Sequence, residues 1–385
     1  MQEHLAVSRE PIRVALDARY VREKPSGIGA YVQALVERLP GLAPADHFFF
    51  WAHPLAPQPL SPATNTSAVV VRPGPNSPWP LLWPRRYASF DGVDVFHAPH
   101  NLMPRGLPCP SVVTIHDVMA LERPDLHLQG PERVVKSVYY PQAIWRALKH
   151  ATRLIAQSKA TADRICAVCP EAAARLSVIS LGPDADLRPA VDLNAAKARA
   201  AKLIGTESPY LLLVGANTAS KRHDLAIAAF AAAVPPPWQL VLVQRRKGRG
   251  ALVRLANRLH VADRIVWLET IARQDLITLL QAAGGLVQPS VYEGFGLPVL
   301  EAMACACPVI ASDIAPFREV TAGAVLLFPA GDLDGLSRAL KDFVKSARLR
   351  QSLAEQGLSR ARDFSWDRCA QETMQVYRDA AAKGH

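Results

Sequence analysis

Two glutamates that flank a glycine-containing turn form the most informative pattern in this sequence. Glu293 lies just before the turn, and Glu301 lies about one helical turn into the predicted helix that follows it. Between them stand Gly294, Phe295, Gly296, Leu297 and Pro298. The glycines let the backbone approach a ligand closely, and the N–H groups at a helix start attract anions. The pattern therefore predicts a diphosphate site with carboxylates suited to sugar hydroxyl groups.

Three further polar residues lie at predicted strand ends. Lys221 follows the apolar stretch 210–214 and precedes a predicted helix, where an ammonium group can neutralise a diphosphate. His116 and Asp117 come at the end of the apolar stretch 112–115. Because ligands bind beyond the carboxyl ends of parallel strands, we expect these residues to face one cleft.

The elements that must position these residues alternate between strands and helices along the whole chain. Apolar stretches without polar alternation indicate parallel strands that are covered on both faces. A turn-rich segment at 182–189 separates two such series. The predicted strands are 12–16, 47–51, 68–71, 93–98, 112–116, 153–157 and 176–179 in the first series, and 210–214, 240–243, 264–267, 286–288, 309–311 and 325–328 in the second.

This alternation predicts an α/β protein with two Rossmann-like, doubly wound parallel-sheet domains that face each other across a cleft. We place the N-terminal domain at 11–185 and the C-terminal domain at 186–364. Two long helices are predicted to end the chain, and we expect the helix in 365–385 to pack back toward the N-terminal domain. The first predicted helix should stop at Pro40.

Composition restricts the partners and the compartment. The chain has 385 residues and a formal net charge of +10, which indicates an anionic partner. The positive charge is dispersed and lacks the aromatic signature of RNA-binding modules, so we expect no nucleic acid. The 6 cysteines are sparse, and no signal peptide or apolar run of membrane-spanning length occurs. We therefore expect a cytoplasmic protein, with peripheral contact at an anionic inner membrane face.

The segment from Glu293 to Glu301-Ala-Met resembles the E-x7-E motif of the retaining glycosyltransferase family 4, whose members have the GT-B fold. The resemblance covers nearly the whole chain, from Asp17-Ala-Arg and Ser26-Gly-Ile-Gly to the terminal helices. Its motif is specific for the family but not for the sugar. The start of the chain resembles that of bacterial surface-polysaccharide mannosyltransferases.

The resemblance implies donor-binding and catalytic roles. Glu293 and the turn contact the donor sugar, Glu301 binds the ribose, Lys221 neutralises the leaving diphosphate, and His116 lies beside the anomeric carbon. The implied catalytic residues are His116, Glu293 and Lys221. The expected donor-binding residues are Gly27, Gly29, Lys221, Arg222, Arg245, Gly294, Phe295, Gly296, Leu297 and Glu301.

Two places where family members commonly carry an arginine hold Ala216 and Ser220 here, so the source of a second positive charge stays open. Arg222, or Arg245 and Arg246 after the next strand, are the candidates. For the acceptor we expect contacts from the residues that end two strands of the N-terminal domain. They are Asp117, which alternatively supports His116, and His97, His100 and Asn101.

Two motifs are interpreted as structural. Asp184 and Asp186 have the spacing of a metal-binding D-x-D pair, but they lie in the predicted inter-domain linker. Cys166 and Cys169 have redox-motif spacing, but they lie late in a predicted helix and have no second pair to complete a zinc site. We therefore predict no metal site and no cofactor.

The resemblance implies transfer of a hexose, with retained configuration and without a metal, from a nucleotide diphosphate sugar to a saccharide or lipid-linked saccharide acceptor in surface polysaccharide synthesis. The first choice of donor is GDP-mannose. A UDP- or dTDP-sugar is the alternative within the family. A phosphorylase or epimerase with the same fold, or a non-catalytic nucleotide-binding protein, is a further alternative. The N-terminal domain is then the acceptor-binding one and the C-terminal domain binds the nucleotide sugar.

Overall fold

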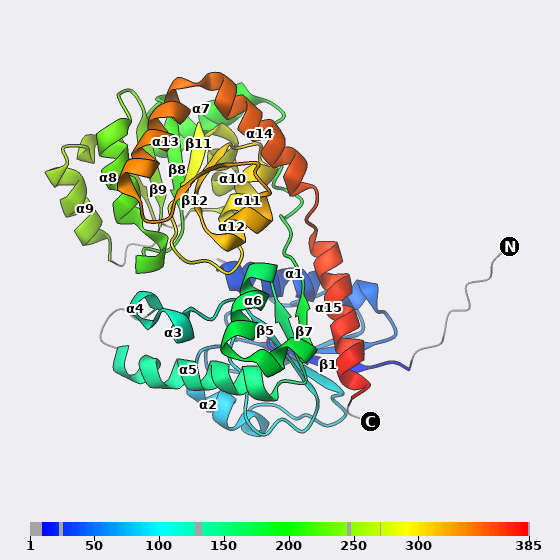
Figure 1. Ribbon diagram of the computed structural model, residues 1–385. Helices are drawn as coiled ribbons and strands as arrows, with labels where there is room; N and C mark the ends of the chain where they lie inside the picture. The colour runs from blue at the N-terminus through cyan, green and yellow to red at the C-terminus, as the bar shows by residue number, and fades with distance from the viewer. Residues whose placement is uncertain (1–9, 23–25, 128–132, 245–247, 270, 384–385) are drawn as a thin grey trace.

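A computed structural model describes residues 10–22, 26–127, 133–244, 248–269 and 271–383. It contains two α/β domains, each built on one sheet (Figure 1). The first sheet has 7 strands in the order β3-β2-β1-β4-β5-β6-β7, and the second has 6 in the order β10-β9-β8-β11-β12-β13. Every strand pairing is parallel. The predicted fold class, two doubly wound parallel-sheet domains, is confirmed.

The N-terminal domain carries the first sheet and the helices that cover it. Its strands are β1 (Arg13–Leu16), β2 (His47–Ala52), β3 (Thr66–Val70), β4 (Val95–Ala98), β5 (Ser111–Ile115), β6 (Arg153–Ala156) and β7 (Leu176–Val178). Its helices are α1 (Gly27–Leu42), α2 (Pro78–Leu82), α3 (Met119–Glu122), α4 (Pro124–His127), α5 (Arg133–His150) and α6 (Lys159–Val168), with 3-10 turns at Pro84–Arg86 and Pro170–Arg175.

The C-terminal domain repeats this plan. Its strands are β8 (Tyr210–Val214), β9 (Gln239–Val243), β10 (Ile265–Leu268), β11 (Gly285–Gln288), β12 (Val309–Asp313) and β13 (Leu326–Pro329). Its helices are α7 (Leu193–Ile204), α8 (His223–Ala233), α9 (Arg249–Arg258), α10 (Arg273–Ala282), α11 (Leu297–Ala304), α12 (Ala315–Thr321), α13 (Leu333–Lys345) and α14 (Ala347–Ala361), with 3-10 turns at Ala219–Lys221 and Ala262–Arg264. The helix α15 (Trp366–Ala381) ends the described chain.

The central strands are apolar because helices cover both faces of each sheet. All residues of β4, β5 and β11 are buried. This is the burial expected of parallel strands in a doubly wound sheet, and it explains why their sequences show no polar alternation.

Three helix predictions were wrong in detail. The helix α1 continues through Pro40 to Leu42, because a proline in the last turn removes only one hydrogen bond of the helix. The helices α2, α3, α4, α9 and α12 were not predicted. Among them α9 buries only Leu252 and Ala256, and the other four have 4 to 7 residues each. Three helices rather than two end the chain, because α13 and α14 are separated at Ser346.

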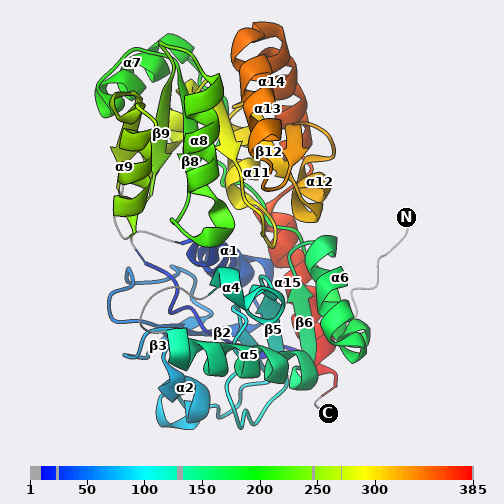
Figure 2. The same ribbon diagram turned by 60° about the vertical axis from the view of Figure 1, so that its left-hand side comes forward.

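The chain passes between the domains twice, and the two passages touch. A Cβ atom on Gly182 would lie 2.2 Å from the backbone nitrogen of Trp366, so a glycine is needed where the passages meet. After the second passage, α15 runs along the N-terminal domain (Figure 2). It packs on α1, where Arg38 Nε donates to Asp367 Oδ1 over 2.8 Å. The last helix therefore belongs physically to the domain that begins the chain.

Candidate active site

The turn after β11 reaches across the domain boundary and contacts the end of β5. A Cβ atom on Gly294 would lie 1.8 Å from the carbonyl oxygen of His116, so no larger residue fits in this arrangement. The Gly294 carbonyl accepts hydrogen bonds from Ser158 Oγ at 2.6 Å and Thr161 Oγ1 at 2.9 Å, at the start of α6. The turn predicted to bind a diphosphate thus lies where both domains meet at the carboxyl ends of their strands, the usual location of ligands in such sheets.

Lys221 and Glu293 form an ion pair at this turn. The Lys221 Nζ lies 2.5 Å from Glu293 Oε1, and the two side chains are only 20% and 12% exposed. Gln288, at the end of β11, adds a weaker contact from Nε2 to Glu293 Oε1 at 3.4 Å. Lys221 and Glu293 are 72 positions apart in the chain and meet in the fold. This is expected if both bind the same ligand.

The turn leads directly into α11. Gly296 has φ +112°, a conformation that favours glycine, and a Cβ there would lie 2.7 Å from Phe317. Leu297 is the first residue of α11, while the Phe295 ring is buried against Phe364, so only the backbone of Phe295 can meet a ligand. In the described part of the chain, no acceptor is recorded for the N–H groups of Phe295 and Gly296. These amides suit an anion.

His116 lies beside the turn. Its Nε2 is 2.8 Å from the Pro99 carbonyl, and its ring meets the Tyr31 ring edge-on. Burial lowers the pKa of His116, against the opposing effect of the hydrogen bond to Pro99. The imidazole is therefore neutral near pH 7, and the proton on Nε2 donates to the carbonyl.

Asn101 and Asp117 hold the backbone around His116. Asn101 Oδ1 accepts from the His116 N–H at 2.7 Å, and its Nδ2 donates to the Asp117 carbonyl at 3.1 Å. Asp117 Oδ1 accepts from the Met119 N–H at 2.9 Å. Asp117 and Asn101 thus hold the turn after β5 that carries His116.

The prediction that His97 contacts an acceptor is wrong. His97 has no exposed surface, and its ring nitrogens bind Tyr377 Oη at 2.7 Å and Thr114 Oγ1 at 2.8 Å. His97 belongs to β4, and α15 covers its side chain through Tyr377. The imidazole therefore cannot reach the cleft. His100, which lies beyond the strand, is only partly buried and its ring lies 5.0 Å from that of Tyr20.

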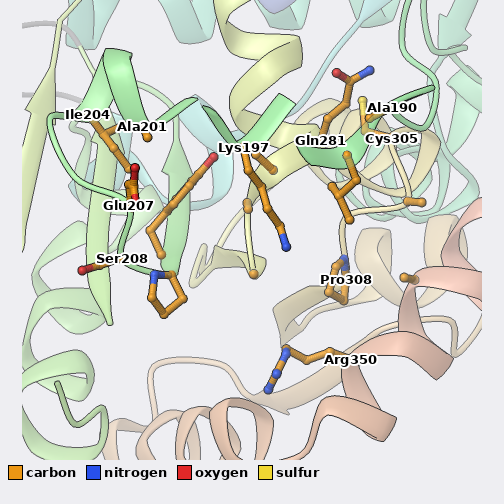
Figure 3. Close-up of a pocket in the computed structure, with 18 of the residues that line it drawn as sticks. Ala190, Lys197, Ala201, Ile204, Glu207, Ser208, Gln281, Cys305, Pro308 and Arg350 are labelled. Atoms are coloured by element: carbon orange, nitrogen blue, oxygen red, sulfur yellow. The ribbon is translucent and has the colours of Figure 1, made fainter. Parts of the chain in front are cut away.

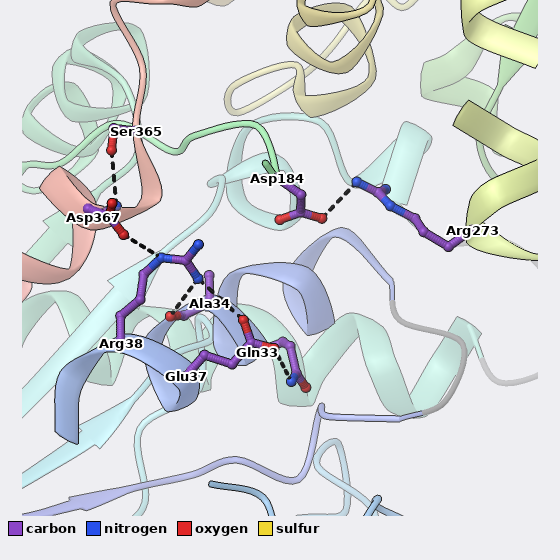
Figure 4. A network of polar contacts seen from close by, with 8 residues as sticks. All are labelled: Gln33, Ala34, Glu37, Arg38, Asp184, Arg273, Ser365 and Asp367. Atoms are coloured by element: carbon purple, nitrogen blue, oxygen red, sulfur yellow. Dashed lines mark hydrogen bonds and ion pairs between the residues drawn. The ribbon is translucent and has the colours of Figure 1, made fainter. Parts of the chain in front are cut away.

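Glu301 is also paired. Its Oε1 accepts from Arg273 Nη1 at 3.0 Å, and the Glu301 side chain is 12% exposed. The same guanidinium binds Asp184 Oδ2 at 2.7 Å (Figure 4) and lies 3.6 Å from Asp186 Oδ1. Asp184 and Asp186, which lie in the linker, thus both lie beside the Arg273 guanidinium.

The remaining donor-binding predictions differ in outcome. Gly27 and Gly29 lie in the first turn of α1, where the Ser26 hydroxyl accepts from the Gly29 N–H at 3.1 Å. Arg222 follows Lys221 directly but pairs with Asp224 at 3.1 Å, so its charge already has a partner. Arg245 and Arg246 lie outside the described residues.

Sequence reasoning missed the residues that tie the turn to the N-terminal domain and to the linker. Ser158 and Thr161 carry a recognisable signal, because Ser158 caps α6 directly after β6. The sequence around Arg164 and Arg273 carries no comparable signal. The Arg164 guanidinium lies 4.2 Å from the centre of the Tyr292 ring and donates to the Glu293 carbonyl at 3.2 Å.

A pocket of about 840 Å³ lies elsewhere, at the opposite end of the second sheet (Figure 3). Tyr210, Gly284 and Pro308, which line it, stand at the amino-terminal ends of strands. Because substrates of doubly wound sheets bind at the carboxyl ends, this pocket is not the candidate active site.

The buried histidines predict a loss of stability in acid. Burial, reinforced by His116, lowers the pKa of His97 to about 3, below the ordinary value of 6.5. The unfolded chain then binds more protons below pH 6.5, so the free energy of unfolding should fall as the pH falls from 6.5 toward 3. Each such histidine adds a slope of at most about 1.4 kcal/mol per pH unit. Urea unfolding followed between pH 7 and 4 measures it.

The variant His97→Gln should unfold with a shallower dependence on pH than the parent, whatever its absolute stability. The exposed His150→Gln change serves as the matched control and should leave the slope unaltered. An equal slope in His97→Gln and the parent would contradict the assignment.

Comparisons with known proteins agree with this geometry. Residues 25–187 match the family model described as Glycosyltransferase Family 4, and residues 194–360 match the one described as Glycosyl transferases group 1. Together the two matches span most of the chain and divide it near the linker.

Individual relatives show the same likeness. The O-antigen chain mannosyltransferase B of Escherichia coli is 28% identical, over 77% of this chain and 78% of that protein. A D-inositol 3-phosphate glycosyltransferase of Mycolicibacterium paratuberculosis is 30% identical over 70% of this chain, which spans only 62% of that relative's length. The solved structure of Anabaena Alr3699/HepE in complex with UDP and glucose superposes with a TM-score of 0.72 at 18% identity, covering 96% of this chain and 100% of that one. The domain matches and the two-sheet architecture lead to one conclusion: this chain belongs to glycosyltransferase family 4 and has the GT-B fold.

Proposed function

We propose that this chain is a retaining glycosyltransferase that moves a hexose from a nucleotide diphosphate sugar to a saccharide acceptor without a metal ion. The observation that carries the proposal is the Lys221–Glu293 pair beside the turn that opens α11. A cation and helix-start amides suit a diphosphate, and the adjacent carboxylate suits sugar hydroxyl groups. The one turn thus offers complementary groups to both halves of a sugar nucleotide.

The leaving diphosphate gains negative charge as its bond to the anomeric carbon breaks. Lys221 and the amides of Phe295 and Gly296 stabilise that charge, and such fixed electrostatic groups commonly supply the largest part of catalysis. The acceptor hydroxyl attacks from the side that the diphosphate leaves, and a phosphate oxygen takes the hydroxyl proton. The new bond forms on the same face as the old one, so the configuration is retained.

Glu293 and His116 position the donor sugar in this proposal. Glu293 is held at the turn by Lys221, and His116 is held by the Pro99 carbonyl and by Asn101. Glu301 binds the ribose hydroxyls at the other side of the turn.

GDP-mannose is the proposed donor. The support for mannose is the similarity to the Escherichia coli relative, which is named as an O-antigen chain mannosyltransferase. The alternative donor is a UDP- or dTDP-sugar. The HepE structure, which holds UDP, supports this alternative. Side chains scattered over the cleft decide between them.

The proposed acceptor is a saccharide, or a lipid-linked saccharide at an anionic membrane face, in surface polysaccharide synthesis. Support comes from the net charge of +10 and from two exposed, stacked tryptophans, Trp79 and Trp83, with Arg86 over the Trp83 ring. Tryptophan and arginine side chains suit a lipid–water boundary. Within the described residues, no helix combines the length and the apolar character that crossing a bilayer requires.

A screen of GDP-, UDP-, dTDP- and ADP-sugars tests the function directly. We expect hydrolysis or transfer with one nucleotide class, first of all GDP-mannose, and a transfer product with the anomeric configuration of the donor by NMR. Nucleotide binding without turnover of any donor would instead indicate a non-catalytic binding protein, and turnover that requires orthophosphate would indicate a phosphorylase.

Lys221 and Glu301 should affect different steps. Lys221→Ala should lower kcat by about 10²- to 10³-fold, since it removes a group that acts on developing charge. Glu301→Ala should mainly weaken nucleotide binding, by roughly 10- to 100-fold, as expected for lost hydrogen bonds to a charged group. Steady-state kinetics and calorimetric titration with the nucleoside diphosphate separate the two effects.

The exposed Lys341→Ala change is the control for Lys221 and should behave like the parent. If both active-site variants retained parental kcat and affinity, the assignment of the turn as the donor site would have to be abandoned.

Metal independence has its own test. Because Lys221 and the backbone amides are proposed to carry the charge of the diphosphate, activity should persist in excess EDTA. Complete loss of activity that Mg²⁺ or Mn²⁺ restores would show that the diphosphate needs a metal. The measurement should use enzyme that has been dialysed against chelator before assay.

A further inference from the structure

Arg273 joins the candidate ribose-binding glutamate to the inter-domain linker. It is the first residue of α10, and its guanidinium contacts carboxylates on two sides. On one side Nη1 donates to Glu301 Oε1 in α11 at 3.0 Å. On the other side Nη2 lies 2.7 Å from Asp184 Oδ2 and 3.6 Å from Asp186 Oδ1, both in the linker (Figure 4). No part of the proposed reaction yet uses this arginine.

The charges around Glu301 show why the arginine matters. Burial raises the pKa of the Glu301 carboxyl, and Asp184 and Asp186 raise it further, while Arg273 opposes all three effects. Cys305, one turn along α11, contributes no charge, because burial raises the pKa of its thiol to about 12. Of the groups that act on Glu301, Arg273 is the one that favours the ionised carboxylate.

The two sides of the guanidinium are not equivalent. Asp184 and Asp186 are 41% and 50% exposed, so water can replace Arg273 there with little loss. Glu301 is 12% exposed, so its charge depends on a partner inside the protein. The aspartates therefore serve to hold the guanidinium in place, and Glu301 receives the effect.

We propose that Arg273 is the positioning residue of the nucleotide subsite, which keeps the Glu301 carboxylate ionised and oriented toward the ribose hydroxyls while Asp184 and Asp186 hold the guanidinium from the linker side. The inference rests on the proposed function, because it takes Glu301 as the ribose ligand. It adds that the sequence between the domains helps to set nucleotide affinity. In this proposal Arg273 acts through Glu301 and not on the donor sugar.

A pH profile of nucleotide binding distinguishes positioning from plain structural support. The parent's profile of GDP or UDP affinity from pH 8.5 to 6 is the reference, and it includes protonation of the nucleotide's terminal phosphate, whose pKa is about 6. In Arg273→Gln the carboxyl of Glu301 would face burial and two aspartates without a cation, so it should take up a proton at higher pH. We expect GDP or UDP affinity to fall by roughly 10-fold or more at pH 7, and to fall further as the pH is lowered toward 6. Isothermal titration calorimetry at several pH values measures both.

Three further variants distinguish the role of Arg273 from a general effect on folding. Arg273→Lys retains a cation and should restore part of the affinity and the flatter profile. Asp184→Asn should weaken binding less than Arg273→Gln, since Asp186 and Glu301 still hold the guanidinium. Arg199→Gln is the matched control. Arg199, in α7, pairs at 3.3 Å with Asp275, which lies on α10 like Arg273. Removing this ion pair should leave nucleotide binding unchanged.

The outcomes separate this inference from the proposed function. If Glu301→Gln loses nucleotide affinity but Arg273→Gln keeps both the parental affinity and its pH profile, the role of Arg273 is refuted and the donor site stands. If Glu301→Gln also binds like the parent, or the parent binds neither GDP nor UDP, the ribose assignment fails and the inference falls with it. A general loss of binding in Arg273→Gln that is independent of pH and not rescued by lysine would reduce Arg273 to a structural residue.

Discussion

The contact between one glycine and one carbonyl group sets the geometry of this site. Gly294 of the C-terminal domain packs so closely on the His116 carbonyl of the N-terminal domain that a Cβ atom would overlap it. Ser158 and Thr161 then hold the Gly294 carbonyl from the start of α6. Because the turn is seated on the other domain, His116 comes beside it across the boundary. Glu293 meets Lys221 within the C-terminal domain itself.

Charge balance is the second constraint. Each glutamate that flanks the turn has a cation from another element, Lys221 for Glu293 and Arg273 for Glu301. A carboxylate that is nearly buried needs such a partner to remain ionised. In the proposed reaction Lys221 serves both the diphosphate and Glu293, which stays ionised beside it. The cation at Glu301 stays in place, since Asp184 anchors it from the linker.

Much of the fold could be predicted because the burial of a strand is visible in the residues of that strand alone. A parallel strand covered on both faces is apolar at every position, so β4, β5 and β11 could be recognised from their own residues. The helix α9 left a weaker trace, since most of it faces solvent. His97 shows the limit of this reasoning. Its strand was predicted correctly, but the side chain is covered by Tyr377, which comes 280 residues later.

The sequence by itself determined the types of element, the turn that opens α11 and the residues that end the strands, because these depend on neighbours along the chain. It therefore placed Lys221, His116 and Glu293 at one edge of the sheets. Only the tertiary structure decided which charged side chains pair with one another. The pairing of Glu301 with Arg273, and of Arg273 with Asp184, joins segments whose local sequences carry no sign of each other. Glu301 meets Arg273 only when α10 and α11 pack together in the C-terminal domain, and Arg273 meets Asp184 only when the linker lies against that domain.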